Sequence, residues 1–240
     1  MERTLFVFEG EKVEPNYFNS LAKVFFSGEE SNILVCFQND IYELYKAIVK
    51  DEDLDPFEII KELNSVAKKQ ESLAGLRRDQ ISQIYLFFDM EPCDNLYSDE
   101  KLCKMLELFD NETENGKLFI SYPMVEALRD IDKHEDYLAL TVDVSRCKGK
   151  IYKGLSSQRG NPKYRDAKKI DKLLWQGLVD VNMRKANGIV SGKYGITTRV
   201  SQPSIASTQI NNYLPNGEVA VLSAFPIFLA DYFGQKVYEL

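Results

Sequence analysis

The sequence predicts an α/β protein with a mostly parallel sheet covered by helices, followed by a largely helical C-terminal part. Up to about residue 132, continuous apolar runs alternate with segments of helical periodicity, and such runs are typical of strands buried on both faces. Strands that alternate with helices favour a parallel sheet. Beyond this point the alternation stops. We therefore expect an α/β domain over residues 1–135 and a helical, basic region over 136–240 that packs on it.

Four predicted strands occupy the first half of the chain. Each is a short apolar run rich in aromatic and β-branched residues, and each ends at charged or turn-forming residues. The runs read RTLFVFEG, NILVCFQ, QIYLFFDME and GKLFISYP, at residues 3–10, 32–38, 83–91 and 116–123.

Predicted helices lie between and after these strands. Asp40, Asp55 and Ser98 each precede a segment of helical periodicity, where their side chains can accept hydrogen bonds from the first helical N–H groups. Pro15 and Pro56 can occupy the first turn of a helix, because proline has no N–H to leave unpaired there. The apolar spacing predicts helices over residues 15–26, 41–50, 55–70, 98–110, 124–131, 164–186 and 217–234.

The composition is that of an ordinary globular protein, with 44% hydrophobic and 28% charged residues among 240. No segment approaches the roughly 20 apolar residues that span a bilayer, and Glu2 and Glu9 interrupt any signal-peptide core. We therefore expect a cytoplasmic protein without membrane segments. The four cysteines form no C-x-x-C pair and there is one histidine, His134, which argues against a zinc site. His134 is expected to be a surface residue.

The charge is distributed unevenly along the chain. The net charge is −7, yet residues 146–200 hold 14 Lys and Arg against 3 Asp and Glu, a net +11. This asymmetry predicts one basic surface on an acidic body, which would attract a polyanion or face an acidic partner protein. Tyr152, Tyr164 and Tyr194 lie among these charges, where they could pack internally or stack on unpaired bases.

Acidic residues follow three of the predicted strands. Glu9 ends the first strand, Asp89 and Glu91 end the third, and Glu126 comes a few residues after the fourth. Because ligands bind at the carboxyl ends of parallel strands, we expect these carboxylates to meet. Hard oxygen ligands of this kind suit Mg²⁺ or Mn²⁺. Three neighbouring acids, Glu11, Glu14 and Asp94, are expected at supporting or surface positions.

Two stretches resemble a known family. FVFEGEKVEPNYF and YLFFDMEPCD resemble the Toprim fold, and more narrowly the RloB and AbiLii type found in bacterial abortive-infection and phage-defence loci. The signature E-G-E-K-x-E-P-N-Y-F is matched from Glu9 to Phe18, and the resemblance covers roughly residues 1–130. The Toprim pattern has a D-x-D pair, whereas this chain has Asp89 followed by Glu91 in the second place. The segment YPMVEALRD is similar to a third acidic motif, which points to Glu126.

The resemblance implies a metal-dependent nuclease that hydrolyses phosphodiester bonds in RNA, tRNA or DNA during anti-phage defence. It implies Mg²⁺ or Mn²⁺ as cofactor, a nearby-encoded ATPase of the ABC or OLD-like type as partner, and a possible homo-oligomer. The expected metal ligands are Glu9, Asp89, Glu91 and Glu126, and the expected catalytic residues are Glu9, Asp89, Glu91 and Lys193.

Four residues are expected to contact phosphate. Gly10 lets a phosphate approach the backbone closely because it has no side chain, and Lys12, Lys185 and Lys193 can neutralise its charge. Lys193 is the stronger of the catalytic lysine candidates, since glycines stand at positions 192 and 195. The G-x-x-x-x-G-K-S/T spacing of a Walker A motif is absent from the sequence, so the chain itself is not expected to be an ATPase.

Two other functions stay open. The first is a Toprim subunit with a degenerate site that binds within an ATPase defence complex, which the D-x-E variation and the net acidity favour. The second is a part of another Toprim enzyme, such as a primase or a topoisomerase. The shortness of the chain and the lack of recognisable companion domains weigh against the second.

Overall fold

A five-stranded, mostly parallel sheet forms the centre of the protein; its four parallel strands were predicted, and the short strand β4 was not. The computed structural model describes residues 3–26, 32–50, 55–66, 73 and 75–239. Four strands run parallel, in the order β2-β1-β3-β5, and β4 joins antiparallel at the β5 edge. Their bounds are β1 Arg3–Phe8, β2 Asn32–Cys36, β3 Ile81–Asp89, β4 Asp110–Asn111 and β5 Gly116–Ser121.

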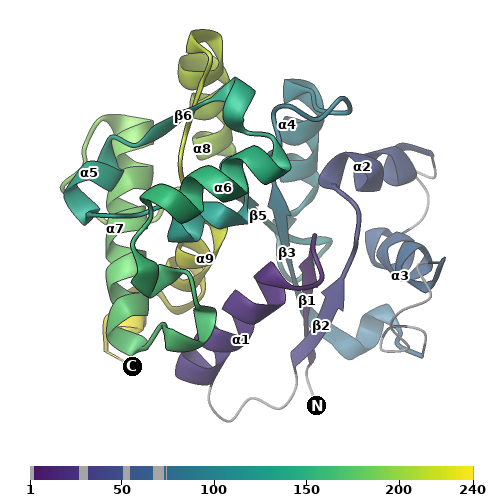
Figure 1. Ribbon diagram of the computed structural model, residues 1–240. Coiled ribbons are helices and arrows are strands. Elements are labelled where there is room, and N and C mark those ends of the chain that lie inside the picture. The colour runs from purple at the N-terminus through teal and green to yellow at the C-terminus, as the bar shows by residue number, and fades with distance from the viewer. Residues whose placement is uncertain (1–2, 27–31, 51–54, 67–72, 74, 240) are drawn as a thin grey trace.

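Helices from opposite ends of the sequence cover one face of this sheet. Helix α1 (Val13–Phe25) and helix α9 (Ala224–Phe233) lie on that face, whereas α2 (Ile41–Lys50) and α3 (Pro56–Val66) lie on the other side (Figure 1). The ring of Phe228 in α9 lies within 6 Å of Phe6, Tyr85, Phe87 and Phe119 on the strands. The apolar face of the sheet is therefore completed by residues of the C-terminal part.

Three of the predicted helix starts in the first half are confirmed by hydrogen bonds; the helix predicted from Pro15 begins instead at Val13. Asp40 Oδ1 accepts hydrogen bonds from the N–H groups of Tyr42 and Glu43, each at 2.8 Å. Asp55 accepts one from Phe57 at 2.7 Å, and Ser98 caps α4 (Asp99–Leu108). These contacts need only residues within one helical turn of each other, which is why the sequence reveals them. Positions 67–70 of the predicted helix over 55–70 lie outside the described residues.

The structure differs from the sequence-based expectation at several places. The helix predicted over 164–186 begins only at Lys172, and the helix predicted over 217–234 begins at Ala224. The segment over 124–131 forms a 3₁₀ helix, η2 (Val125–Arg129), instead of an α-helix. The C-terminal part holds a two-stranded antiparallel sheet, β6 (Thr141–Asp143) with β7 (Glu218–Ala220), where we expected helix alone. Strands of three residues are too short to show a period of two, so sequence patterns do not detect them.

The remaining elements of the C-terminal part are helical. The longest is α7 (Lys172–Ser191), whose N-terminus is capped by Asp171. Among the described residues, every helix is too short or too polar to cross a bilayer. The other helical elements of this part include α5 (His134–Leu138), α6 (Gly149–Arg159), the 3₁₀ helix η5 (Ala167–Lys169) and α8 (Gln202–Thr208).

Candidate metal centre

Three carboxylates meet where two central strands end. Glu9 directly follows β1, Asp89 is the last residue of β3, and Glu91 lies two positions further on. One carboxylate oxygen from each lies within 4.8 Å of the others. We call these three residues the acidic group. They meet because β1 and β3 are adjacent and parallel, with Phe8 paired to Phe87, so both carboxyl ends reach the same edge of the sheet.

The backbone holds Glu9 over the end of β3. Its N–H donates to the carbonyl oxygen of Phe87 at 3.1 Å, which continues the strand pairing by one residue. Its side-chain Oε2 accepts a hydrogen bond from the backbone N–H of Asp89 at 2.9 Å. The Glu9 carboxylate is therefore positioned by the backbone of the neighbouring strand.

Glu91 is positioned by a sharp turn after β3. Its φ is 44°, in the left-handed region that few residues other than glycine adopt. Its N–H donates to the carbonyl oxygen of Pro123 at 3.2 Å, and its own carbonyl accepts from the N–H of Asp94 at 2.8 Å. The two hydrogen bonds hold Glu91 in a backbone conformation that costs energy, as occurs at ligand-binding sites.

Two further buried acids border the acidic group. Glu14, in the first turn of α1, accepts a hydrogen bond at Oε1 from the N–H of Gly10 at 3.1 Å. Glu126, in η2, is only 1% exposed, and its Oε1 lies 3.7 Å from Lys153 Nζ and 4.0 Å from Arg129 Nη2. The structure thus places Glu126 beside the acidic group, facing two cations, whereas we expected it among the metal ligands.

The acidic group favours protonation when no cation is present. Burial, followed by the charge of Glu91, raises the pKa of Glu9 well above its usual range. Burial, followed by the charge of Glu9, does the same to the pKa of Asp89. The pKa values of Glu14 and Glu91 are also raised, first by burial. Several carboxylates therefore share a site with too little positive charge to stabilise all of them as anions.

The donors at this site fit a hard divalent cation. All of them are carboxylate oxygens, which Mg²⁺, Mn²⁺ and Ca²⁺ prefer over nitrogen or sulfur. Glu126 Oε2 is buried and has no hydrogen-bond partner among the described residues, although a buried carboxylate oxygen without a partner is costly. Glu9, Asp89 and Glu91 could hold the ion directly, and Glu126 could accept a hydrogen bond from a water bound to it.

Gly10 does not leave room for a phosphate as expected. A Cβ atom at this position would lie 2.8 Å from Oε2 of Glu14, so the Glu14 carboxylate occupies the space beside the glycine. Glu14 is therefore more closely tied to this site than the sequence suggested. The signal for it is the four-residue spacing, which lets a side chain in the first turn of a helix accept from the N–H that precedes it. Lys12 is exposed in the intervening turn.

The structure contradicts the expected role of Lys185. Its side chain is 1% exposed, and its Nζ donates to the carbonyl oxygens of Tyr137 and Leu140 at 2.7 Å and 2.6 Å. It therefore fastens α7 to the end of α5 and cannot reach a phosphate. Lys193 is exposed beyond the C-terminus of α7, and no contact within the described part of the chain connects it with the acidic group.

Lys153 is a cation that sequence reasoning missed. It lies in α6, its side chain is 50% exposed, and its Nζ is 3.7 Å from Glu126 Oε1. Its charge lowers the pKa of both Glu14 and Glu91, against the stronger effect of burial. Lys153 belongs to the basic segment over 146–200, but nothing in the sequence distinguishes it from the 13 other basic residues there.

The aromatic residues of the basic segment serve mainly as packing. Tyr152 and Tyr164 are buried, and their hydroxyls pair with Asp130 and His134, each at 2.8 Å. Neither tyrosine can stack on a base. His134, expected at the surface, is half-buried through this contact, and burial lowers its pKa. Tyr194 is partly exposed.

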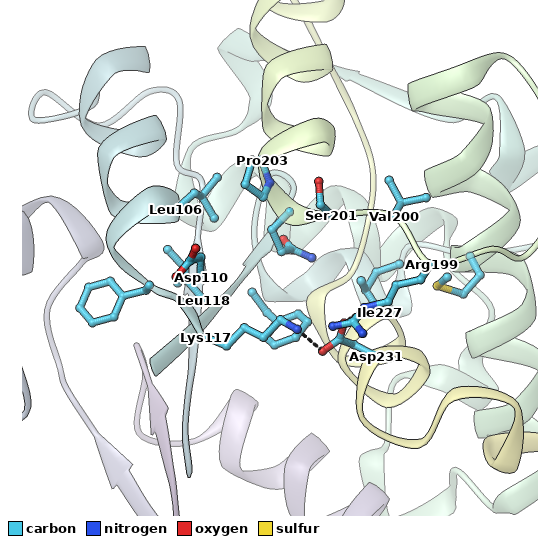
Figure 2. A pocket seen from close by; sticks show the side chains of 14 residues that line it. Leu106, Asp110, Lys117, Leu118, Arg199, Val200, Ser201, Pro203, Ile227 and Asp231 are labelled. Atoms are coloured by element: carbon cyan, nitrogen blue, oxygen red, sulfur yellow. Dashed lines mark hydrogen bonds and ion pairs between the residues drawn. The ribbon is translucent and has the colours of Figure 1, made fainter. Parts of the chain in front are cut away.

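A separate pocket of about 470 Å³ lies at the β5 edge, between α4, α8 and α9. Figure 2 shows Lys117 of β5 and Asp231 of α9 pointing toward each other across it. Their Nζ and Oδ2 atoms are 2.6 Å apart, and Arg199 contacts the other oxygen of Asp231. No residue of the acidic group lines this pocket. The pocket is lined by residues from both halves of the chain and is separate from the candidate metal centre.

Comparisons of the chain with protein-family models, with curated proteins and with solved structures found no match.

Proposed function

We propose that this protein is a Mg²⁺- or Mn²⁺-dependent nuclease that hydrolyses phosphodiester bonds. The observation that carries the proposal is the convergence of Glu9, Asp89 and Glu91, with carboxylate oxygens within 4.8 Å of one another at the carboxyl end of a parallel sheet. The resemblance of residues 9–18 to the RloB and AbiLii type of Toprim protein supports the same chemistry. That resemblance also suggests a cytoplasmic role in phage defence under the control of an ABC or OLD-like ATPase.

The side chains of the site have distinct roles in this proposal. A bound divalent ion would polarise the scissile phosphate and activate a water molecule. Asp89 and Glu91 bind the ion, and Glu9 either binds it or accepts the proton of the attacking water. Lys153 replaces Lys185 and Lys193 as the cation beside the scissile phosphate, because it is half-exposed and lies next to the buried acids. Glu126 keeps the ammonium of Lys153 turned toward the site.

The test compares Glu9→Gln with Glu11→Gln. The first change removes a charge from the acidic group but keeps an oxygen that can accept from the Asp89 N–H, whereas Glu11 is exposed in the same loop. We expect Glu9→Gln to weaken Mn²⁺ binding in calorimetry at least 10-fold and to abolish cleavage of RNA or DNA, with Glu11→Gln close to wild type. Thermal unfolding of both variants checks that the fold is intact. Unchanged Mn²⁺ affinity in folded Glu9→Gln would contradict the proposal.

The second function, a binding subunit without activity, is favoured by one observation. Both lysines expected to assist catalysis are unsuited to it, since Lys185 is buried and Lys193 has no contact with the acidic group. Mn²⁺ binding that requires Glu9, together with no cleavage of any nucleic acid in the presence of the partner ATPase, would identify this function.

A further inference from the structure

A basic groove runs along α1 and away from the acidic group. It consists of two adjoining hollows of about 270 Å³ and 640 Å³, which share Asn16 and Lys168. One wall is α1, and the other is the segment from Arg165 to Lys172, which passes beside α1 (Figure 1). We call this feature the α1 groove. The basic residues that line it are Lys23, Arg129, Arg165, Lys168, Lys169 and Lys172.

The positive charge of the α1 groove is largely uncompensated. The two acids in the described part of its lining are Asp166 and Asp171. Both accept hydrogen bonds from backbone N–H groups at helix starts, and Asp166 Oδ2 also lies 3.7 Å from Lys169 Nζ. Among the described residues, no carboxylate lies within 4.0 Å of the ammonium groups of Lys23, Lys168 or Lys172. Lysines that are exposed and lack acidic partners attract anions most strongly.

The near end of the groove adjoins the candidate metal centre. Arg129 lines this end, and its Nη2 lies 4.0 Å from Oε1 of Glu126. Val13 lines it too, one position before Glu14. Lys23 and Lys172 lie at the far end. Ten residues of α-helix separate Val13 from Lys23, so the groove extends over about 15 Å.

The two walls of the groove are fastened to each other. Ser20 of α1 donates to the carbonyl oxygen of Ile170 at 3.3 Å and accepts from Nε1 of Trp175 at 3.1 Å. Trp175 is fully buried at the start of α7. The groove is therefore a pre-formed surface, and a ligand would not have to order it on binding.

The described residues of the groove offer contacts for phosphates and none for base stacking. Within the described lining, Tyr17 is the one aromatic residue; it is only 3% exposed, and its hydroxyl donates to the carbonyl oxygen of Tyr164. Asn16 and Asn19 add amide groups, which can donate to phosphate oxygens. Repeated positive charge along a narrow path fits a chain with regularly spaced negative charge.

We propose that the α1 groove binds the backbone of a nucleic acid strand without reading its sequence and leads that strand to the acidic group. This inference rests on the proposed nuclease function, for which it supplies the substrate path. A length of about 15 Å holds about four stacked nucleotides at 3.4 Å each. The strand is held by its phosphates, so affinity depends on salt and not on base composition.

Binding in the absence of metal tests this proposal without any contribution from cleavage. Fluorescence anisotropy in EDTA would compare three labelled probes of one sequence: single-stranded RNA, single-stranded DNA and double-stranded DNA. The test variant is Lys168→Ala/Lys172→Ala. The matched control is Lys46→Ala/Lys104→Ala, which removes two exposed lysines from α2 and α4, outside the groove.

We expect the groove variant to bind single strands about 25-fold more weakly at 0.1 M salt, because each phosphate contact contributes a slope of about 0.7 in log affinity against log salt. The salt slope should become shallower by about 1.4, and the control variant should match wild type. Equal losses in the two variants, or no loss in the groove variant, would overturn the proposal. Some probes should bind more weakly to the groove variant than to wild type. If wild type prefers RNA or DNA among these probes, that preference identifies the substrate.

The outcome separates failure of the groove from failure of the nuclease function. Glu9→Gln should still bind the probes in EDTA, because Glu9 does not line the groove. The groove variant should still bind Mn²⁺ with wild-type affinity. If strand binding depends on the groove but the protein does not bind Mn²⁺, the metal centre alone is refuted. If the groove variant binds the probes with unchanged affinity and still cleaves nucleic acid with Mn²⁺, the groove alone is refuted.

Discussion

The Oε2 atom of Glu9 accepts a hydrogen bond from the backbone N–H of Asp89 at 2.9 Å. This contact joins the ends of β1 and β3, and it places one carboxylate of the acidic group against the backbone of another. Phe8 pairs with Phe87 in parallel, so β1 and β3 end at the same edge of the sheet. The acidic group is thus a consequence of strand register.

The metal-free protein should lose stability as the pH rises. Glu9 and Asp89 have folded-state pKa values well above their ordinary 4.5 and 3.8, so the folded state keeps protons that the unfolded state releases. Their contribution is complete below about pH 4 and is lost as the pH approaches the folded-state pKa values. In EDTA between pH 5 and 8, Glu9→Gln should therefore gain stability relative to wild type, as measured by urea unfolding.

Mn²⁺ should reverse this loss in wild type and have little effect in Glu9→Gln. An ion that binds only the folded state stabilises it by about 2.7 kcal/mol at 100 times its dissociation constant. Protons compete for the same oxygens, so the stabilisation should grow with pH. A stability difference between the two proteins that is constant from pH 5 to 8 would show that the acidic group is ionised without a cation.

Gly10 and Glu14 should be coupled energetically. Gly10→Ala alone should destabilise the protein by about 1 kcal/mol, because the new methyl group would lie 2.8 Å from Glu14 Oε2 and displace the carboxylate that accepts from the Gly10 N–H. In a Glu14→Ala background the same change should be neutral or stabilising, since alanine restricts the unfolded chain. Urea unfolding of the four proteins measures the coupling, and additive effects would mean that the carboxylate moves aside without cost.

Lys153 should matter for turnover more than for substrate affinity. In the proposed reaction, Lys153→Gln removes a positive charge next to the scissile phosphate, so kcat should fall about 100-fold with a smaller change in KM. Lys150→Gln is the matched control, because Lys150 is exposed in the same helix and outside the contacts of Glu126. A fall in kcat of the same size in both variants would assign the effect to the general charge of α6.

The ion pair between Lys117 and Asp231 should contribute to stability. Both side chains are mostly buried, and their removal from water is compensated by a contact of 2.6 Å. Asp231→Ala should therefore lower the free energy of unfolding by about 3 kcal/mol, since Lys117 and Arg199 lose a shared partner. Asp180→Ala, which breaks an exposed pair with Arg184, should cost at most about 0.5 kcal/mol. Chemical denaturation measures both variants. Equal losses of unfolding free energy in Asp231→Ala and Asp180→Ala would show that the buried ion pair contributes no more than the exposed one.

The parts of the fold that depend on neighbouring residues could be predicted from the sequence. The four parallel strands, and the caps at Asp40, Asp55 and Ser98, depend on apolar patterns and hydrogen bonds within a few residues. The meeting of Glu9 with Asp89 and Glu91 also followed, because parallel strands end at a common edge. The three-residue strands β6 and β7 could not be found, since they exist only through pairing across 74 intervening positions.

Burial of long polar side chains was decided by the tertiary structure alone. The sequence determined that basic residues gather over 146–200, but not that Lys185 points into the core toward two carbonyl oxygens while Lys153 faces the acidic group. A lysine has an apolar stem and a charged end, so its own sequence is compatible with either environment. The choice depends on which segment lies opposite, and here α5 and η2 came to face α7 and α6 only when the chain folded.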